Sequence, residues 1–154
     1  MSIEARAKQL GIAIPAPAAP LGAYVPAVRS GSLIFVSGAV AMKDGQPLFR
    51  GKLGAELSIE QGQAAARQAA INALGSLKGE IGDLDRVSRI VRVEGHVASA
   101  PGFTDQPKVI NGASELLGEL FGDRGKHSRV ALGAAELPMG SPVEVALIVE
   151  VDAG

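Results

Sequence analysis

The stretch that decides the fold is KHSRVALGAAELPMGSPVEVALIVEV, residues 126–151. Two mostly apolar runs, at about residues 128–136 and 142–151, surround LPMGSP and predict a closing pair of strands. In the second run alternate residues are apolar, as in a strand with one buried face. Ala146 and Ile148 make the opposite face partly apolar as well. A second copy of the chain or a sheet curled on itself would cover that face, and the pattern favours neither over the other.

Each of these two strands also carries a charge. Arg129 stands at the start of the first strand, and Glu144 lies within the second. A charged side chain on a strand needs water or a partner, because burying it alone is costly. An ion pair with Glu150 across a hairpin would satisfy Arg129, and a position facing water would satisfy Glu144. The alternative is that the two charges flank a site for a small molecule.

Two helices are expected upstream of these strands. SIEQ at residues 58–61 has the form of a capping box, and helical periodicity continues from there to about residue 78. Gly79 and Gly82 are expected to end this helix. A second apolar face with helical spacing predicts another helix at residues 108–122.

Strands are expected before and between the helices. Residues 24–42 predict two strands around a turn at 29–32, and DGQP at 44–47 predicts a further turn with a short edge strand at 48–49. Alternating apolar residues predict a strand at 87–99. The order β-β-(β)-α-β-α-β-β indicates an α+β fold in which two helices pack against one sheet.

Length and composition limit the class of protein. A chain of 154 residues fits a single domain with a core that needs no disulfide or metal. Hydrophobic residues make up 47%, but only four Phe and one Tyr are present, so Val, Leu, Ile and Ala must build the core. The absence of cysteine excludes disulfides, thiolate metal sites and a cysteine nucleophile. A net charge of −1 without a basic stripe does not favour nucleic-acid binding.

The sequence also predicts a location in the cell. The first residues, MSIEARAKQL, contain charges of both signs and no apolar segment, so they do not form a secretory signal. No apolar run approaches the roughly 18 residues that would cross a bilayer. Next comes IPAPAAPLGA at residues 14–23, a Pro- and Ala-rich lead-in that is expected to be extended. We expect a cytoplasmic protein.

Common catalytic motifs are missing from the sequence. There is no G-x-G-x-x-G segment, no Walker loop and no G-x-S-x-G elbow. His96 and His127 have no companions at ligand spacing, so no metal site is expected. We interpret His96 as an exposed strand residue and His127 as a loop residue rather than as catalytic bases.

Five fragments of the sequence nevertheless fit one known family when they are taken in order. They are GAYVPAV at 22–28, FVSGAVA at 35–41, INGASELLGELFG at 110–122, HSRVALGAAELP at 127–138 and PVEVALIVEV at 142–151. From about residue 20 to its end the chain resembles the RidA family, also called YjgF and once named endoribonuclease L-PSP. The form HSR-x-A-x-G-x-x-x-LP is similar to a longer, Ala-rich branch of that family.

The resemblance implies a fold, an assembly and an activity. It implies a chorismate-mutase-like subunit with a mixed sheet of about five to six strands packed on two helices. It further implies a barrel-forming homotrimer with ligand sites between subunits, and one domain over residues 1–154 with an N-terminal extension at 1–20. Family members hydrolyse reactive enamines and imines such as 2-aminoacrylate to 2-keto acids and ammonia, without a cofactor. A non-enzymatic protein that binds small carboxylates in the same cleft is the alternative.

The resemblance also implies roles for the two charged residues. Arg129 matches the family arginine that holds the substrate carboxylate, for which a planar guanidinium is well suited. Glu144 matches the family glutamate that positions or activates the attacking water.

Five further positions match residues that line the family cleft. Tyr24, the only tyrosine, matches a tyrosine of the cleft, and Ser37 and Gly38 match a pair whose backbone lies against the ligand. Asn111 matches an asparagine near the cleft. Ala131 stands where the family often has cysteine, so its backbone can contact a ligand but its side chain offers no chemistry. The family's older ribonuclease label is disfavoured by the charge and by the scarcity of aromatic residues.

Overall fold

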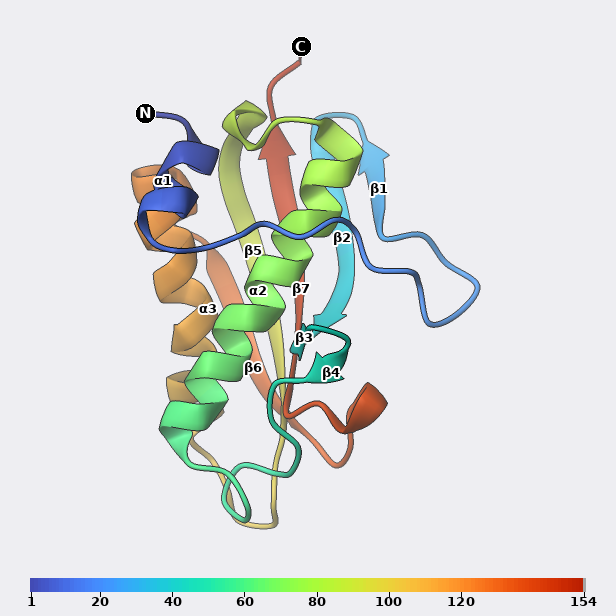
Figure 1. Ribbon diagram of the computed structural model, residues 1–154, viewed down its shortest axis with the longest axis vertical. Coiled ribbons are helices and arrows are strands. Elements are labelled where there is room, and N and C mark those ends of the chain that lie inside the picture. Colours follow the sequence, from blue (N-terminus) through green and yellow to red (C-terminus); the bar gives the residue numbers. More distant parts are fainter. Residues whose placement is uncertain (154) are drawn as a thin grey trace.

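One mixed sheet organises the protein, which we describe for residues 1–153 from a computed structural model. The sheet has five strands in the order β1-β2-β7-β5-β6 (Figure 1). Their bounds are Ala27–Ser30 for β1, Leu33–Val40 for β2, Val87–Ala98 for β5, Ser128–Ala134 for β6 and Val143–Val151 for β7. The expected α+β fold with helices packed on a mixed sheet is confirmed.

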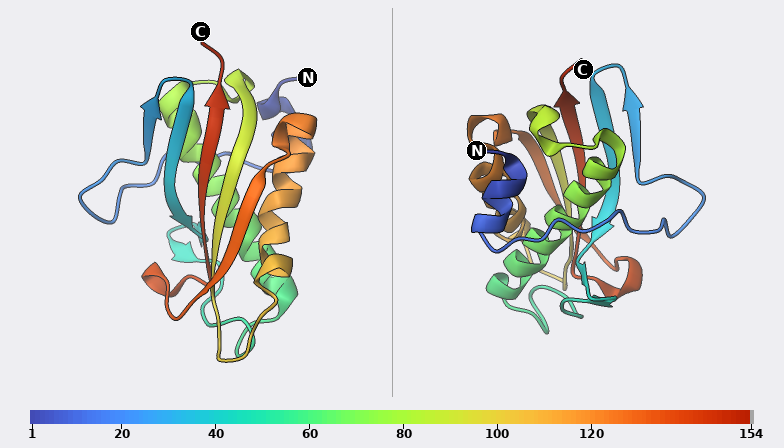
Figure 2. Two further views of the ribbon diagram at one scale, coloured as in Figure 1. Left: turned by 180° about the vertical axis from the view of Figure 1, so that it is seen from behind. Right: turned by 45° about the horizontal axis from the view of Figure 1, so that its top comes forward.

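The last strand, β7, lies at the centre of the sheet. It pairs antiparallel with β2 on one side and with β5 on the other. Strand β6 pairs with β5 in parallel, which requires a crossover through a helix. That helix is α3 (Gln106–Phe121), and it covers the same face of the sheet as α2 (Ile59–Ile81) (Figure 1). Figure 2 shows the other face of the sheet, which no helix covers.

The crossover contradicts one sequence-based expectation. The two closing strands are not a hairpin, because β5 lies between β6 and β7. Arg129 is in register with Val93, whereas Glu150 lies opposite Leu33 and Arg89. An ion pair between Arg129 and Glu150 across a hairpin is therefore wrong. The segment after β6 passes through a short 3-10 turn, η3 (Pro138–Gly140), on its way to β7.

The small elements differ slightly from expectation. A short helix, α1 (Ile3–Gln9), begins the chain. The edge strand expected at 48–49 lies instead at β4 (Gln46–Pro47), which pairs with β3 (Met42–Lys43) as a separate two-stranded ribbon. The turn between them places Asp44 and Gly45 at positive φ, which sets this register. Two further 3-10 turns are η1 (Leu84–Arg86) and η2 (Gly122–Gly125).

Helix α2 begins as predicted and ends later than predicted. The Ser58 hydroxyl accepts from the Gln61 N–H, and the Gln61 side chain accepts from the Ser58 N–H, which confirms the capping box. The helix continues through Gly79 to Gly82, whose φ of 83° ends it. Gly79 is therefore not a terminator. A Cβ there would overlap the ring of Pro17, so this glycine makes room for the N-terminal segment.

The core lies between the sheet and the two helices. Alternate residues of β7 are buried, and they meet a face of α2 made largely of alanines that lets the helix approach the sheet closely. The largest fully buried side chains are Ile34, Leu53, Leu74, Leu77, Leu84, Ile90, Ile110, Leu116, Leu117, Leu120, Leu147 and Val87. No helix among residues 1–153 is both long and apolar enough to traverse a bilayer.

The crossing of α2 and α3 generates the first prediction. A Cβ at Gly112 would overlap the backbone oxygen of Gln63, so Gly112→Ala should destabilise the protein by about 1–3 kcal/mol despite the better helix propensity of alanine. Gly118 lies on the same helix with nothing within 4 Å of an added Cβ. Gly118→Ala should therefore stabilise by about 0.5–1 kcal/mol. Urea unfolding of both variants tests the prediction, and equal effects would contradict it.

Candidate functional site

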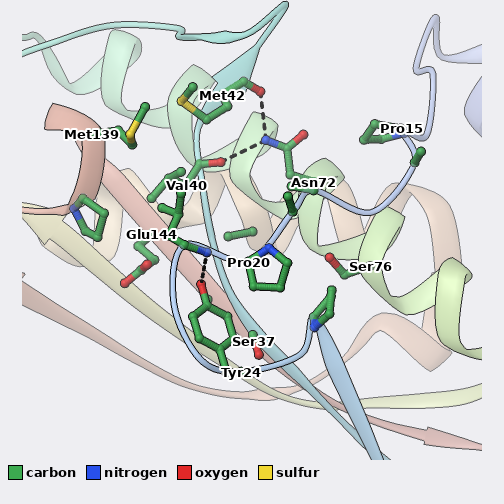
Figure 3. Close-up of a pocket in the computed structure, with 18 of the residues that line it drawn as sticks. Pro15, Pro20, Tyr24, Ser37, Val40, Met42, Asn72, Ser76, Met139 and Glu144 are labelled. Atoms are coloured by element: carbon green, nitrogen blue, oxygen red, sulfur yellow. Dashed lines mark hydrogen bonds between the residues drawn. The ribbon is translucent and has the colours of Figure 1, made fainter.

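A cavity of about 580 Å³ opens at the edge of β2. Strand β1 pairs only with residues 33–36 of β2, and the register then shifts between Val36 and Ala39. The edge of β2 beyond that shift is left without a neighbouring strand, and the cavity lies there. Its walls come from the N-terminal segment, β2, α2, β7 and η3 (Figure 3).

Glu144 is the acid that β7 places in this cavity. Its neighbours along the strand, Val143 and Val145, are buried against the helices, so the Glu144 side chain points to the uncovered face. It is half-buried and lies against Gly38 of β2, where an added Cβ would come within 3.0 Å of the carboxyl carbon. A glycine at position 38 thus leaves the room that the carboxylate occupies. Asp44 is the other acid in the lining.

Tyr24 and Ser37 complete this half of the predicted site. The Tyr24 hydroxyl accepts from the Leu21 N–H at 3.2 Å, and the Ser37 hydroxyl donates to the Val25 carbonyl at 2.7 Å. Both residues line the cavity with Gly38 and Glu144 (Figure 3). The structure therefore brings together four of the seven residues that the sequence singled out. No lysine, arginine or histidine stands among the described residues of the lining.

Arg129 belongs to a second group, at the far edge of the sheet. One guanidinium nitrogen, Nη1, donates to Asn111 Oδ1 at 2.8 Å and to Ser114 Oγ at 3.2 Å, and Nη2 lies 3.3 Å from the Pro107 carbonyl oxygen. These three acceptors are neutral oxygens of α3. Within residues 1–153 no carboxylate lies in ion-pair distance of Arg129. Ala131, two residues further along β6, packs against the core.

An arginine held by neutral acceptors is suited to bind an anion. The three contacts fix the guanidinium plane, yet leave its positive charge without a compensating negative one. A small carboxylate would supply that charge in a bidentate contact. The geometry of Arg129 and Asn111 thus fits the carboxylate-binding role that the resemblance implied.

The two groups do not meet within one chain. Arg129 points toward α3, on the helix-covered side, whereas Glu144 points to the uncovered side. Strand β5 also separates β6 from β7, which adds about 10 Å across the sheet. One small molecule cannot contact both residues of the same chain.

Two residues of the Arg129 group were missed by sequence reasoning. Ser114 Oγ lies 2.9 Å from His127 Nε2, and His127 Nδ1 lies 2.6 Å from the Gly125 carbonyl oxygen. Because that carbonyl only accepts, Nδ1 carries the proton, and in the neutral ring Nε2 accepts from the Ser114 hydroxyl. His127 does lie in a loop, as expected, but it is bonded at both ring nitrogens and orients the hydroxyl beside Arg129.

One signal in the sequence pointed to Ser114. It follows Asn111 by three residues on a predicted helix, so both side chains lie on the same face of that helix. The partner His127 could not be found in this way, because its approach to α3 depends on how η2 returns the chain to the sheet. Among residues 1–153 no three His, Asp or Glu side chains gather as a metal site would require.

Comparison with known proteins places this fold and site in context. Residues 4–151 match the model of a family described as YjgF/chorismate mutase-like, putative endoribonuclease. The Trypanosoma cruzi protein TCP17 is 44% identical over 151 residues, which cover 97% of this chain and 94% of that protein. A crystal structure of a putative endoribonuclease from Shewanella oneidensis is similar with a TM-score of 0.95 and 36% identity, and covers 98% of this chain and 100% of its own.

A further crystal structure is similar over nearly the whole chain. It is that of a protein of unknown function from Agrobacterium tumefaciens, with a TM-score of 0.91 and 40% identity, covering 97% of this chain and 92% of its own. These matches extend through the N-terminal residues, which the resemblance had left outside the shared core.

The Ser114–His127 contact generates the second prediction. The ¹⁵N chemical shifts of the His127 ring should report the Nδ1–H tautomer, in contrast to the Nε2–H form that free imidazole side chains favour. Ser114→Ala should leave the Nδ1–H form in place, because the Gly125 carbonyl remains, and should shift only the Nε2 signal, because the hydroxyl that donates to Nε2 is lost. His96 provides the internal control, since the substitution should leave its signals unchanged. A protonated Nε2 in the unsubstituted protein would contradict the network.

Proposed function

This chain belongs to the YjgF/chorismate mutase-like family, and we propose that it hydrolyses reactive 2-imino acids and their enamine tautomers to 2-keto acids and ammonia. The observation that carries the proposal is that one fold contains two complementary groups, which we call the two halves of the site. One half is a guanidinium fixed by neutral acceptors, and the other is a carboxylate in a largely apolar cavity. The first suits a substrate carboxylate, and the second suits a water and a developing positive charge.

The proposed reaction needs only proton handling by the protein. Arg129 binds the carboxylate of the substrate, and Glu144 takes a proton from a water whose oxygen attacks the imine carbon. The C–O bond forms as the C=N π bond breaks, which gives a carbinolamine. Glu144 returns the proton to the amino group, and the C–N bond breaks as a hydroxyl lone pair forms the carbonyl. The hydroxyl proton passes to the departing ammonia, which leaves as ammonium. A protonated imine is electrophilic enough to react in this way without a cofactor.

We also propose that the site forms only between copies of the chain. Arg129 and Glu144 of one chain face opposite sides of the sheet, so a complete site needs Arg129 from one copy and Glu144 from another. The uncovered face of the sheet offers a surface for such an assembly, because Val28, Phe35 and Leu132 are 51%, 43% and 52% exposed on it. Burying these side chains against a second copy supplies a driving force. A homotrimer, as the resemblance implied, is the assembly that we propose.

The two other candidate functions require different residues of the site. A protein that only binds small carboxylates would need Arg129 and its acceptors but would have no use for Glu144. A ribonuclease, the activity named in the description of the family, would need cations to hold phosphates, and among residues 1–153 the lining of the cavity contains none. We therefore propose a small-molecule ligand and no nucleic-acid or membrane partner.

The third prediction separates catalysis from binding. Glu144→Gln should lower kcat for imine hydrolysis by about 10²- to 10⁴-fold, because the general base is lost, while the affinity for the product 2-keto acid is retained. Arg129→Lys is the matched control, since it keeps the charge but loses the planar fork, and it should weaken keto-acid affinity instead. Keto-acid release from imines generated by an amino-acid oxidase, together with calorimetry, measures both. Release no faster than the spontaneous rate in the unsubstituted protein would favour the binding protein.

The fourth prediction tests whether the Arg129 and the Glu144 of one site come from different chains. Arg129→Ala and Glu144→Gln chains, each inactive alone, should regain activity when they are co-expressed with different tags and purified as mixed assemblies. In a mixed trimer about one site in three would combine an intact Arg129 with an intact Glu144. Arg129→Ala co-expressed with itself is the control. Mixed assemblies as inactive as this control would show that the site lies within one chain.

A further inference from the structure

The N-terminal segment of the chain is built into the wall of the cavity. Residues 11–23, which we call the N-terminal strap, run from α1 across the outer side of α2 toward β1 (Figure 1). Gly75 and Gly79, one turn apart on α2, form the notch in which the strap lies. A Cβ at Gly75 would overlap the carbonyl oxygen of Pro15, and one at Gly79 would overlap the ring of Pro17.

Both ends of the strap are fixed. Before it, Ile3 and Ala7 of α1 are only 3% and 1% exposed, and Glu4 forms an ion pair with Lys78 of α2 at 3.0 Å. After it, Ser37 of β2 donates its hydroxyl to the Val25 carbonyl at 2.7 Å and its backbone N–H to the Pro26 carbonyl at 2.9 Å. The strap is therefore a fixed wall rather than a free tail.

The strap gives the cavity an apolar surface. The strap residues in the lining are Pro15, Ala16, Ala18, Ala19, Pro20 and Leu21. The wall formed by other elements contains Val40, Met42 and Met139 (Figure 3). These side chains offer no hydrogen bonds, so this part of the cavity does not suit a polar group.

The amide in the lining is also unavailable to a ligand. Asn72 Nδ2 donates to the carbonyl oxygens of Val40 and Met42, both at 2.9 Å, and Asn72 Oδ1 accepts from Gln68 Nε2 at 2.9 Å. The bonds of Asn72 fix α2 to the end of β2. The remaining polar side chains of the lining are those of Glu144, Ser37, Tyr24, Asp44 and Ser76, so the apolar surface of the cavity comes mainly from the strap, Val40, Met42 and Met139.

We propose that the strap forms a pocket for the substrate side chain and makes this chain selective for 2-imino acids with a large aliphatic or thioether side chain. The inference rests on the proposed function and names its substrate class. A cavity of about 580 Å³ is far larger than the imine derived from alanine requires, and that imine would leave the apolar wall in contact with water. Each additional buried methylene group should raise kcat/KM by about fourfold, which corresponds to 0.8 kcal/mol.

Imines generated in situ from alanine, leucine and methionine test this selectivity. The leucine- and methionine-derived imines should be hydrolysed with a kcat/KM at least about tenfold above that of the alanine-derived imine. Equal values, or a preference for the small imine, would overturn the inference. If that small imine is still hydrolysed in a Glu144-dependent manner, the proposed function stands while the inference fails.

A pair of strap variants tests the role of the wall. Ala19→Leu enlarges a side chain in the wall of the cavity and should lower kcat/KM for the leucine-derived imine at least about tenfold more than for the alanine-derived imine. Ala13→Leu is the matched control, because Ala13 is an exposed strap residue that lies outside this cavity, and it should change neither value. Equal losses from Ala19→Leu on both imines would overturn the assignment of this wall to the side chain.

Binding measurements decide the inference even if no imine is hydrolysed. Calorimetry would compare pyruvate with 4-methyl-2-oxopentanoate, whose side chain corresponds to that of leucine. The larger keto acid should bind at least about tenfold more tightly, and Ala19→Leu should abolish that difference. Equal affinities for the two acids in the unsubstituted protein would reject the side-chain pocket independently of catalysis.

Discussion

The central position of β7 is the constraint on which the rest of the structure depends. Its backbone is hydrogen-bonded on both edges, to β2 and to β5, so neither edge can serve another partner. One face of the strand is fixed in the core by alternate valine and leucine side chains. Because successive side chains of a strand point to opposite faces, Glu144 must lie on the opposite face of the sheet. The carboxylate in the cavity is thus positioned by the burial of Val143 and Val145.

The parallel crossover through α3 separates the two charged residues of the candidate site. It carries the chain past β5 and places β6 at the outer edge, with Arg129 pointing toward α3. There the guanidinium meets an amide, a hydroxyl and a carbonyl rather than an acid. A cation held in this way retains its attraction for an anion, because its neighbours orient it without neutralising it. The same crossover makes a site assembled from two copies the arrangement that we propose.

The N-terminal strap lies outside the sheet and its two long helices, yet it forms part of the wall of the cavity. Proline removes donors and favours an extended chain, and the two glycines of α2 provide the space in which that chain lies. Glycine in a helix interior lowers stability by about 0.5–1 kcal/mol relative to alanine. The close contact between α2 and the strap is therefore the physical reason for two glycines one turn apart. A fixed apolar wall beside Glu144 then separates the part of the cavity that handles protons from the part suited to an aliphatic side chain.

Local patterns determined the elements of this protein, and tertiary contacts determined their partners. The capping box at Ser58, the alternation of the last strand and the periodicity of both long helices were predicted correctly, because each depends on neighbours within a few residues. The pairing of β6 with β5 rather than β7 was not, since a loop that crosses over a strand resembles a hairpin loop in sequence. Glycine near the end of a helical pattern predicts a helix end at Gly79, whereas its actual role, making room for Pro17, exists only in the folded chain. The sequence identified Arg129 and Glu144 as residues of interest, but only the folded sheet shows that they face opposite sides of one chain.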